Sequence, residues 1–278
     1  MHQPPRRFGH YDVSILHDGF YEAPSEVLTH TAGEAARQDA IAQWGLPTIR
    51  IPVKAFLLQG PDGVTLVDAG TGTAWGAAYG HARAALQRHG VEPGQIRRVL
   101  ITHLHGDHAL GLVDGDKAFF PEAEIIVPAA DLGFFGDEAK RAVTPQNRQG
   151  GFGIAATLKQ LYAGRMRPTE PGPVLPGIEL MALPGHTYGH GGYLIEGEAR
   201  SLLLWGDALH LSTLQATDPE IGIVYDLDGA MAAHTRRVIL DRAHRAGWIV
   251  SGGHIEGFAT VGKCGSGYEL AEAGGITL

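Results

Sequence analysis

The sequence predicts an α+β protein, an α/β sandwich in which two mixed β-sheets pack face to face with helices outside. Short apolar runs alternate with helical patterns along the 278 residues, and the order of hairpins followed by mixed strands and helices occurs in both halves. Two similar halves in succession fit two packed sheets covered by helices. No linker or low-complexity segment interrupts the pattern, so we expect residues 1–278 to form a single domain.

The first half predicts strands before helices. Residues 11–19 alternate in polarity like a half-buried strand, and residues 53–70 are typical of a hairpin with Pro61-Asp62-Gly63 at its turn. Residues 73–90 are predicted to form a helix that ends at Gly90. After these come a strand at 96–103, a strand and helix within 123–135, and a helix at 153–164.

The second half predicts strands at 178–186, 191–197 and 201–207, a long helix at 229–247, and strands at 248–254 and 267–272. The long helix is amphipathic. Its apolar side is formed by Met231, Thr235, Val238, Ile239 and Ala246, and its polar side by Arg237, Asp241, His244 and Arg245.

Composition narrows the classes of partner. The formal net charge is −8 and no basic run occurs, which argues against a nucleic-acid partner. No stretch approaches 18 apolar residues, and the N-terminus lacks an apolar signal core, so we expect a cytoplasmic protein without a membrane span. Cys264 is the single cysteine, which excludes an intrachain disulfide and a cysteine-based zinc site.

A cluster of ligand-type residues follows the apolar strand at 96–103. The stretch "VLITHLHGDH" places His103, His105, Asp107 and His108 within six residues. Residues i and i+2 of an extended segment point to one face, so His103 and His105 project together. Packed imidazoles and a buried carboxylate need a compensating charge, which a divalent cation such as zinc supplies.

Three more residues have the same placement. His186, Asp207 and His254 each follow an apolar strand and a glycine, which allows the backbone to turn sharply. Side chains at the same ends of neighbouring strands meet at one edge of a sandwich. Seven ligands exceed the need of one tetrahedral zinc, so the sequence predicts two metals about 3.5–4 Å apart that share a carboxylate and a hydroxide.

These residues carry a resemblance to a known family. "THLHGDH" resembles the His-x-His-x-Asp-His motif of metallo-β-lactamase-fold hydrolases, and "VDAG", "PGHTYGH", "WGDALH" and "SGGH" resemble the other blocks of that fold in order. The resemblance implies a four-layer αββα fold. It also implies that His103, His105 and His186 bind one metal, that Asp107, His108 and His254 bind the second, and that Asp207 bridges both. Asp68 and His190 would support the ligands from behind.

The resemblance is strongest to the branch that contains quorum-quenching lactonases and methyl parathion hydrolase. It implies a dinuclear zinc hydrolase, with iron, manganese or cobalt as alternative metals, that uses a bridging hydroxide to open lactones or related esters such as acyl-homoserine lactones. Asp107 would orient the hydroxide or receive its proton, and His210, which stands where lactonases often have tyrosine, would contact substrate. This histidine resembles the organophosphate hydrolases, so phosphotriesterase activity is a candidate side reaction.

Three alternatives stay open. They are a thioester hydrolase like glyoxalase II, a mononuclear iron sulfur dioxygenase on the same fold, and a non-catalytic binding module. Because no basic cluster lies near the motifs, we expect a small, neutral and partly apolar substrate. A homodimer stays open. The candidate apolar lining of the substrate pocket is Phe119, Phe120, Phe134, Phe135, Phe152, Tyr188 and Phe258.

Overall fold

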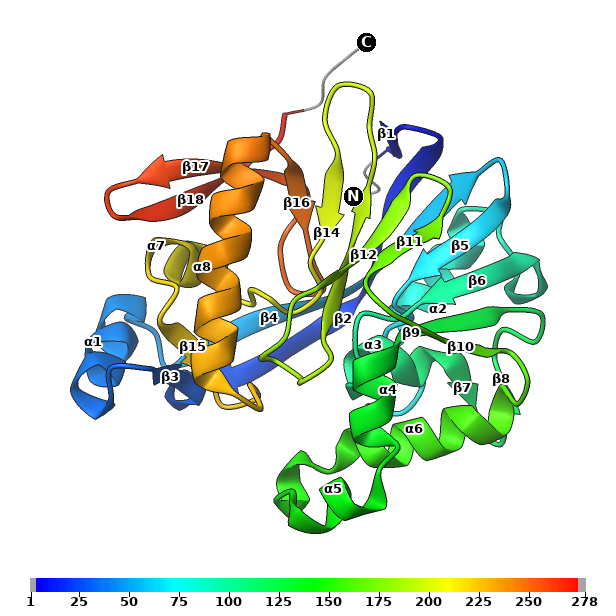
Figure 1. Cartoon of the computed structure of the whole chain (residues 1–278), viewed down its shortest axis with the longest axis horizontal. Helices are drawn as coiled ribbons and strands as arrows, with labels where there is room; N and C mark the ends of the chain where they lie inside the picture. The colour runs from blue at the N-terminus through cyan, green and yellow to red at the C-terminus, as the bar shows by residue number, and fades with distance from the viewer. Residues whose placement is uncertain (1–3, 275–278) are drawn as a thin grey trace.

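Two seven-stranded mixed β-sheets pack face to face in the computed structural model, which describes residues 4–274 (Figure 1). The first sheet has the order β1 (Arg6–Phe8), β2 (Tyr11–Pro24), β4 (Thr48–Gly60), β5 (Gly63–Val67), β6 (Ile96–Leu100), β9 (Glu124–Pro128) and β10 (Met166–Thr169). The second has the order β11 (Gly172–Leu175), β12 (Ile178–Ala182), β13 (Gly191–Ile195), β14 (Leu202–Leu204), β16 (Ile249–Ser251), β17 (Ala259–Cys264) and β18 (Gly267–Glu272).

Both sheets combine antiparallel and parallel pairs. In the first sheet β2, β4 and β5 pair antiparallel, whereas β5, β6, β9 and β10 pair parallel. In the second sheet the pair β14 and β16 is parallel and its neighbours are antiparallel. The predicted pair of mixed sheets is therefore confirmed.

Alternate residues of the central strands enter different cores. Val67 and Leu100 lie in the core between the sheets, whereas Leu66 on β5 and Val99 on β6 lie in the core under the helices of the first sheet. On β14, Leu203 likewise faces the core under α8. Both faces are buried along β14 and at the C-terminal end of β6, so Leu202–Leu204 and residues 99–101 are continuously apolar.

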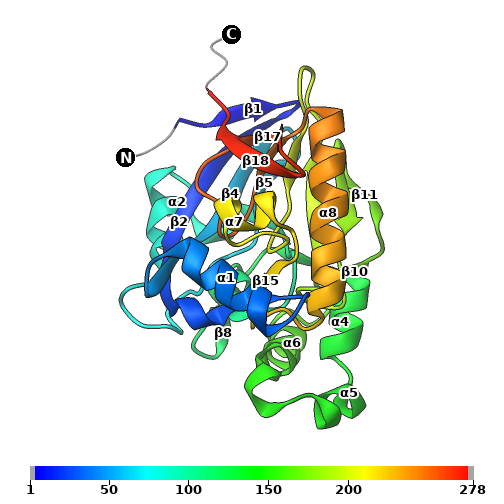
Figure 2. The same ribbon diagram turned by 90° about the vertical axis from the view of Figure 1, so that its left-hand side faces the viewer.

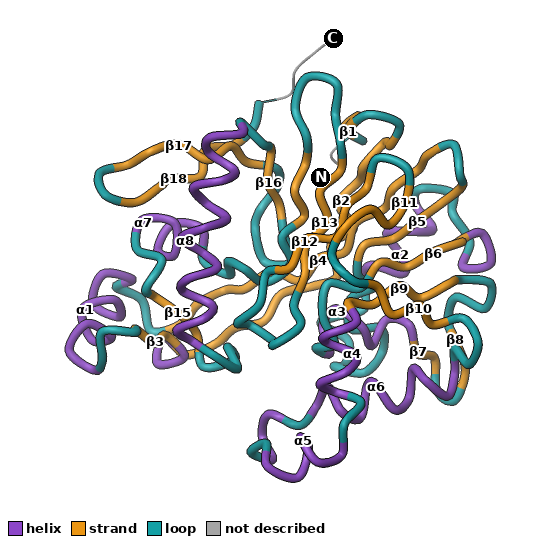
Figure 3. Tube along the Cα trace, in the orientation of Figure 1, coloured by secondary structure: helices purple, strands orange, loops and turns teal. Residues whose placement is uncertain are grey.

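Helices cover the outer faces of both sheets. The described chain contains α1 (Glu34–Trp44), α2 (His81–Arg88), α3 (Gly106–Ala109), α4 (Ala129–Phe135), α5 (Glu138–Val143), α6 (Gly150–Leu161), α7 (Ser212–Thr217) and α8 (Gly229–Ala246). Of these, α2, α4 and α6 pack on the first sheet, and α7 and α8 pack on the second. Figure 2 shows α2 and α8 on opposite sides of the strands. Figure 3 shows the helical segment α4–α6 projecting at one end of the molecule. The predicted outer helices are confirmed, and no helix within residues 4–274 is long and apolar enough to cross a membrane.

Two details of the predicted helices are wrong. Residues 73–80 are turns, and the helix is confined to His81–Arg88, because Gly76 and Gly80 have φ angles of 87° and 78° that a right-handed helix cannot contain. In α8, Met231 and Val238 are 38% and 51% exposed, and Ala246 is also exposed. The fully buried Arg236 lies on the inner side instead, because an ion pair there compensates its charge.

The structure also contains elements that the sequence did not predict. Both β2 and β4 extend beyond their predicted ends, to Pro24 and from Thr48, and β2 bulges between His17 and Gly19. Beyond the sheet, β3 (Leu28–His30) pairs with β15 (Ile221–Ile223), and a further apolar core forms beneath α1. The extended ends of β2 and β4 carry Tyr21 and Ile51, which line the cavity described below.

Candidate metal centre

The seven candidate metal ligands lie together where strands of both sheets end. His103 follows β6, and His186, Asp207 and His254 follow β12, β14 and β16. Together with His210, their ligand atoms form three groups, each with all atoms within 4.8 Å of one another. The groups are His103, His105 and His186; Asp107, His108, Asp207 and His254; and His186, Asp207 and His210. Because the groups share His186 and Asp207, the groups form one continuous centre.

Asp207 occupies the middle of this centre. Its Oδ2 atom lies 3.2 Å from His186 Nε2 and 3.0 Å from His254 Nε2, and its Oδ1 atom lies 3.1 Å from His108 Nε2. The carboxylate of Asp207 thus contacts histidines on both sides of the cluster. His105 presents Nδ1, 2.9 Å from His186 Nε2, whereas His103 presents Nε2, 3.7 Å from Asp207 Oδ2.

Several ligand-type atoms are buried without a hydrogen bond, even where, as for His108 Nε2 and Asp207 Oδ1, two of them lie 3.1 Å apart. Within residues 4–274 these include His103 Nε2, His108 Nε2 and Asp207 Oδ1. Buried polar atoms are almost always satisfied, so a cluster of unsatisfied ones requires an explanation. Imidazole nitrogens and carboxylate oxygens are ligands of zinc and related ions, and the residues present therefore fit a divalent cation.

The charge states of the rings suit a metal site. Burial and neighbouring histidines lower the pKa of His103 and of His105 well below the ordinary value, so these rings are neutral and keep a free lone pair. Burial also disfavours charge on His108 and His254, but Asp207 and Asp107 outweigh it and raise the pKa of both rings. A cation bound at the centre would therefore displace protons from His108 and His254.

The far edges of the ligand rings are held by hydrogen bonds. His108 Nδ1 lies 2.8 Å from Asp68 Oδ2, and Asp68 Oδ1 accepts from Thr102 N at 2.8 Å. Asp68 is the one non-glycine residue within 4–274 with a positive φ, 57°, which is a strained conformation that aims its carboxylate at the ligand loop. His254 Nδ1 donates to the Pro52 carbonyl at 2.6 Å.

His186 has a carboxylate behind it that the sequence analysis missed. Asp226 Oδ1 lies 2.9 Å from His186 Nδ1, and Asp226 Oδ2 lies 3.3 Å from Arg236. Although burial opposes the charge, His186 and Arg236 lower the pKa of Asp226 to about 2. A carboxylate behind a ligand histidine fixes its orientation. The sequence feature that could have revealed this carboxylate is Arg236, an arginine on the inner side of the long helix that requires a buried partner.

His190 and His210 occupy different places at the centre. His190 accepts from Asp207 N at 2.9 Å and donates from Nδ1 to Leu183 O at 2.8 Å, so both ring nitrogens are engaged and the ring positions the backbone of Asp207. His210 Nε2 lies 3.1 Å from Asp207 Oδ2, and its buried Nδ1 has no partner within the described chain. Burial lowers the pKa of His210 to about 4, so its ring is neutral.

Two buried charged side chains fix the ligand loops to the scaffold. Asp131 on α4 accepts from Leu104 N at 2.7 Å and from the Thr187 hydroxyl, which ties the loop after β6 to the loop after β12. Lys54 on β4 donates to the Ile255 carbonyl and pairs with Glu256 at 3.1 Å, next to His254. The sequence analysis missed both, since neither lies in a motif.

Comparison with known families decides the identity of the fold. The model of the metallo-β-lactamase superfamily matches residues 49–254, a span that contains all seven candidate ligands. The chain belongs to the metallo-β-lactamase superfamily. The predicted resemblance and the predicted four-layer fold are thereby confirmed. Superfamily membership together with the His/Asp cluster identifies a metal-dependent hydrolase.

Solved structures share the metallo-β-lactamase fold over almost the whole chain. The hydrolase AbOPH of the β-lactamase superfamily superposes with a TM-score of 0.88 at 23% identity and 99% coverage of both chains. AidC, a dizinc quorum-quenching lactonase, gives 0.84 at 19% identity and 98% coverage of both. A probable metal-dependent hydrolase from Staphylococcus aureus gives 0.73 at 20% identity, covering 96% of this chain and 99% of that one. A search of curated proteins returns no match.

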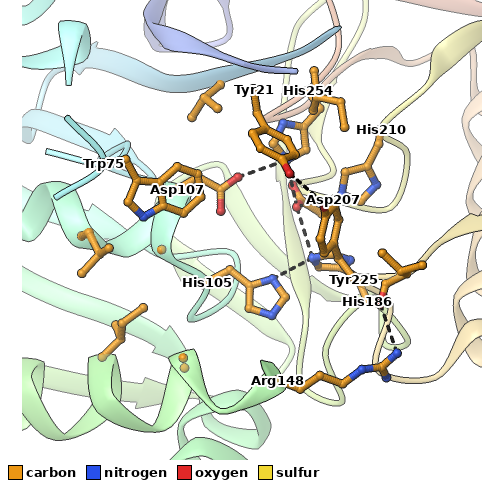
Figure 4. A pocket seen from close by; sticks show the side chains of 18 of the residues that line it. Tyr21, Trp75, His105, Asp107, Arg148, His186, Asp207, His210, Tyr225 and His254 are labelled. Carbon is orange, nitrogen blue, oxygen red and sulfur yellow. Dashed lines mark hydrogen bonds and ion pairs between the residues drawn. The ribbon is translucent and has the colours of Figure 1, made fainter. Parts of the chain in front are cut away.

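A cavity of about 1060 Å³ leads to the centre of this metallo-β-lactamase-fold protein (Figure 4). Its floor contains His105, Asp107, His186, Asp207, His210 and His254. Its walls are mostly apolar or aromatic and include Tyr21, Ile51, Val53, Trp75, Tyr79, Leu110, Ile154, Val224, Tyr225 and Leu227. Figure 4 shows the hydroxyls of Tyr21 and Tyr225 directed at each other, and Tyr225 donates to Tyr21 at 3.2 Å.

The predicted aromatic lining of the pocket is wrong. None of the seven proposed aromatics is among the residues that line the cavity. Phe120, Phe135 and Phe152 lie in the core of the first sheet, and Phe258 lies between the sheets. Phe119 and Phe134 pack against the first-sheet core, and the ring of Tyr188 contacts that of Phe134 at a tilt of 56°. The aromatic residues beside the motifs pack in or against the cores. The aromatic residues that line the cavity come from β2, the loop before α2 and the loop after β15.

Proposed function

We propose that the chain is a dinuclear zinc hydrolase that opens lactones or related esters. The observation that carries this proposal is the position of Asp207, whose carboxylate lies between two pairs of histidines. His103 and His186 are on one side, at 3.7 and 3.2 Å, and His108 and His254 are on the other, at 3.1 and 3.0 Å. Such a carboxylate suits two cations better than one.

In this proposal His103, His105 and His186 hold one zinc ion, and Asp107, His108 and His254 hold the second, with Asp207 shared. When bound, the pair of cations would lower the pKa of a water from about 15.7 toward about 7 and polarise the substrate's carbonyl oxygen. The orphaned nitrogens of His103 and His108 support this assignment.

The protein's own groups would handle protons and orientation. Asp107 lines the cavity, and its Oδ2 lies 3.4 Å from His254 Nε2 and 3.6 Å from His108 Nε2. A carboxylate so placed orients a water and accepts its proton. The neutral His210 lines the same cavity and donates to Asp207 from Nε2, so its ring would contact an ester bound there.

The mostly apolar walls favour an ester with an acyl chain. The shared fold of AidC, a lactonase, supports lactones as the substrate class. His210 motivates phosphotriesters as a side reaction. A thioester hydrolase like glyoxalase II would need basic residues to bind its thiol cofactor. The sequence has no basic cluster near the motifs, so an ester or lactone suits the site better.

Elemental analysis and a substrate panel test the proposal. We expect the zinc-reconstituted protein to hold two zinc ions per chain and to hydrolyse acyl-homoserine lactones, simple lactones or aryl esters faster than thioesters. A single iron with oxygen consumption on a persulfide substrate would instead establish a sulfur dioxygenase, and faster thioester cleavage would establish a thioesterase. Metal binding without any turnover would favour a binding module.

A further inference from the structure

Arg148 brings a positive charge into the cavity that the proposed chemistry does not use. It is the only arginine or lysine among the cavity-lining residues of the described chain. Arg148 ends the short 3₁₀ helix Gln146–Arg148 between α5 and α6 and reaches toward the loop after β15 (Figure 4). Sequence analysis passed over it because it lies outside every motif.

The guanidinium is held in place by backbone oxygens. One terminal nitrogen donates to Asp226 O at 3.2 Å, and the other donates to Val224 O at 3.1 Å. Asp226 is also the residue whose carboxylate holds His186. Arg148 is therefore bound to the backbone of Asp226, the residue that supports His186, and lines the same cavity as that candidate ligand.

The charge of Arg148 has no counterion within residues 4–274. Arg83 and Arg236, which are also partly or fully buried, each pair with a carboxylate, Asp114 and Asp226 respectively. Carbonyl oxygens accept hydrogen bonds but do not neutralise charge. A guanidinium has five N–H donors, so donors remain for a ligand after two are engaged. The planar fork of a guanidinium matches the two oxygens of a carboxylate.

We infer that the cavity selects an ester or lactone whose end remote from the scissile bond carries a carboxylate, which Arg148 binds. The inference rests on the proposed hydrolase function and revises the substrate class, since the sequence predicted a neutral substrate. Asp107 and Asp207, the carboxylates that line the cavity, belong to the metal centre and repel a substrate anion less once cations are bound. Arg148 thus provides the specificity, and the apolar walls hold the chain between the two ends.

Two aryl esters of equal length test the inference on the zinc-reconstituted protein. One is the 4-nitrophenyl monoester of adipic acid, and the other carries a primary amide in place of the free carboxylate. We expect the wild-type KM to be about tenfold or more lower for the carboxylate, as for a charge-assisted hydrogen bond. In Arg148→Gln this preference should disappear through KM, with kcat on the amide little changed.

Two further variants separate charge from scaffold effects. Arg148→Lys keeps the charge and should retain part of the preference, and Arg141→Gln removes an exposed arginine of α5 outside the cavity and should retain all of it. Equal KM values for the two esters in the wild type overturn the inference and leave the hydrolase proposal standing. An equal loss of kcat on both esters in Arg148→Gln assigns Arg148 a structural role and also overturns it. Failure to hydrolyse either ester or any lactone contradicts the proposed function itself.

Discussion

Asp226 Oδ1 lies 2.9 Å from His186 Nδ1, on the edge of the ring opposite Nε2, which faces Asp207 at 3.2 Å. The contact joins the loop before α8 to the loop after β12. Arg236 in turn neutralises Asp226 from within the core. A candidate metal ligand is therefore oriented by a buried chain of charges that begins on the inner side of α8.

The first prediction concerns this chain. Asp226→Asn removes the charge behind His186, and we expect metal affinity to fall by about ten- to hundredfold, as for other carboxylates behind ligand histidines. Competition with a chelator measures the affinity. Asp241→Asn, at an ion pair with Arg245 away from the centre, is the matched control. An unchanged chelator midpoint in Asp226→Asn would show that the contact does not support a ligand.

A second prediction concerns His210, whose Nε2 lies 3.1 Å from Asp207 Oδ2. His210→Phe keeps a planar ring but loses the hydrogen bond, and we expect kcat/KM to fall by about ten- to hundredfold, the range for one bond to a charged group. Metal content should stay at the wild-type level. His234→Asn, on the exposed side of α8, should leave both quantities unchanged. Loss of metal in His210→Phe would instead make His210 a ligand.

The third prediction is a pH dependence of stability. Burial raises the pKa of Asp131 to about 6, above the value of about 4 expected in the unfolded chain. The folded protein therefore binds the proton more tightly, and this contribution is fully present below pH ~4 and lost as the pH rises through ~6. We expect the unfolding free energy of Asp131→Asn to gain about 2–3 kcal/mol relative to the wild type between pH 4 and pH 7, because the variant has no carboxyl to ionise.

Urea unfolding of the metal-free proteins at both pH values measures this difference. The comparison isolates Asp131 because the other titrating groups are common to both proteins. A difference that does not change with pH would show that Asp131 is ionised throughout, held by its bonds from Leu104 N and the Thr187 hydroxyl.

A fourth prediction concerns Gly253, which allows the chain to pass close to the centre. A Cβ at this position would lie 2.7 Å from His108 Cε1 and 3.2 Å from Asp207 Oδ1. Gly253→Ala should displace both ligands, weaken metal binding and destabilise the protein by about 1–3 kcal/mol. Gly153→Ala is the control: this exposed glycine of α6 has open space around it, and the change should stabilise the helix by about 0.5–1 kcal/mol. Thermal unfolding and chelator competition distinguish the two, and normal metal binding in Gly253→Ala would contradict the placement of His108.

The sequence predicted the features that depend on local pattern. The strands that precede His103, His186, Asp207 and His254 are short, rich in apolar residues and followed by turns, so their ends could be located without knowing how the chain packs. The convergence of these residues could be inferred because strand ends in packed sheets share an edge.

Features that depend on contacts between distant segments could not be predicted. Asp226 and His186 are 40 residues apart, and Arg148 and Asp226 are 78 residues apart. Neither Asp226 nor Arg148 lies in one of the motifs, so the residues around them in the sequence did not assign them a role. The prediction of the aromatic residues that line the pocket was wrong for the same reason. The local sequence does not distinguish Phe135 and Phe152, which lie in the core, from Trp75 and Tyr225, which line the cavity. Only the packing of the helices does so.

The central claim is that one carboxylate joins two metal sites, and metal stoichiometry tests it most directly. Elemental analysis after reconstitution and gel filtration should find two zinc ions per chain in the wild type and at most one in Asp207→Ala, with hydrolysis lost. Two zinc ions retained in Asp207→Ala, or one metal in the wild type at saturating zinc, would contradict the account.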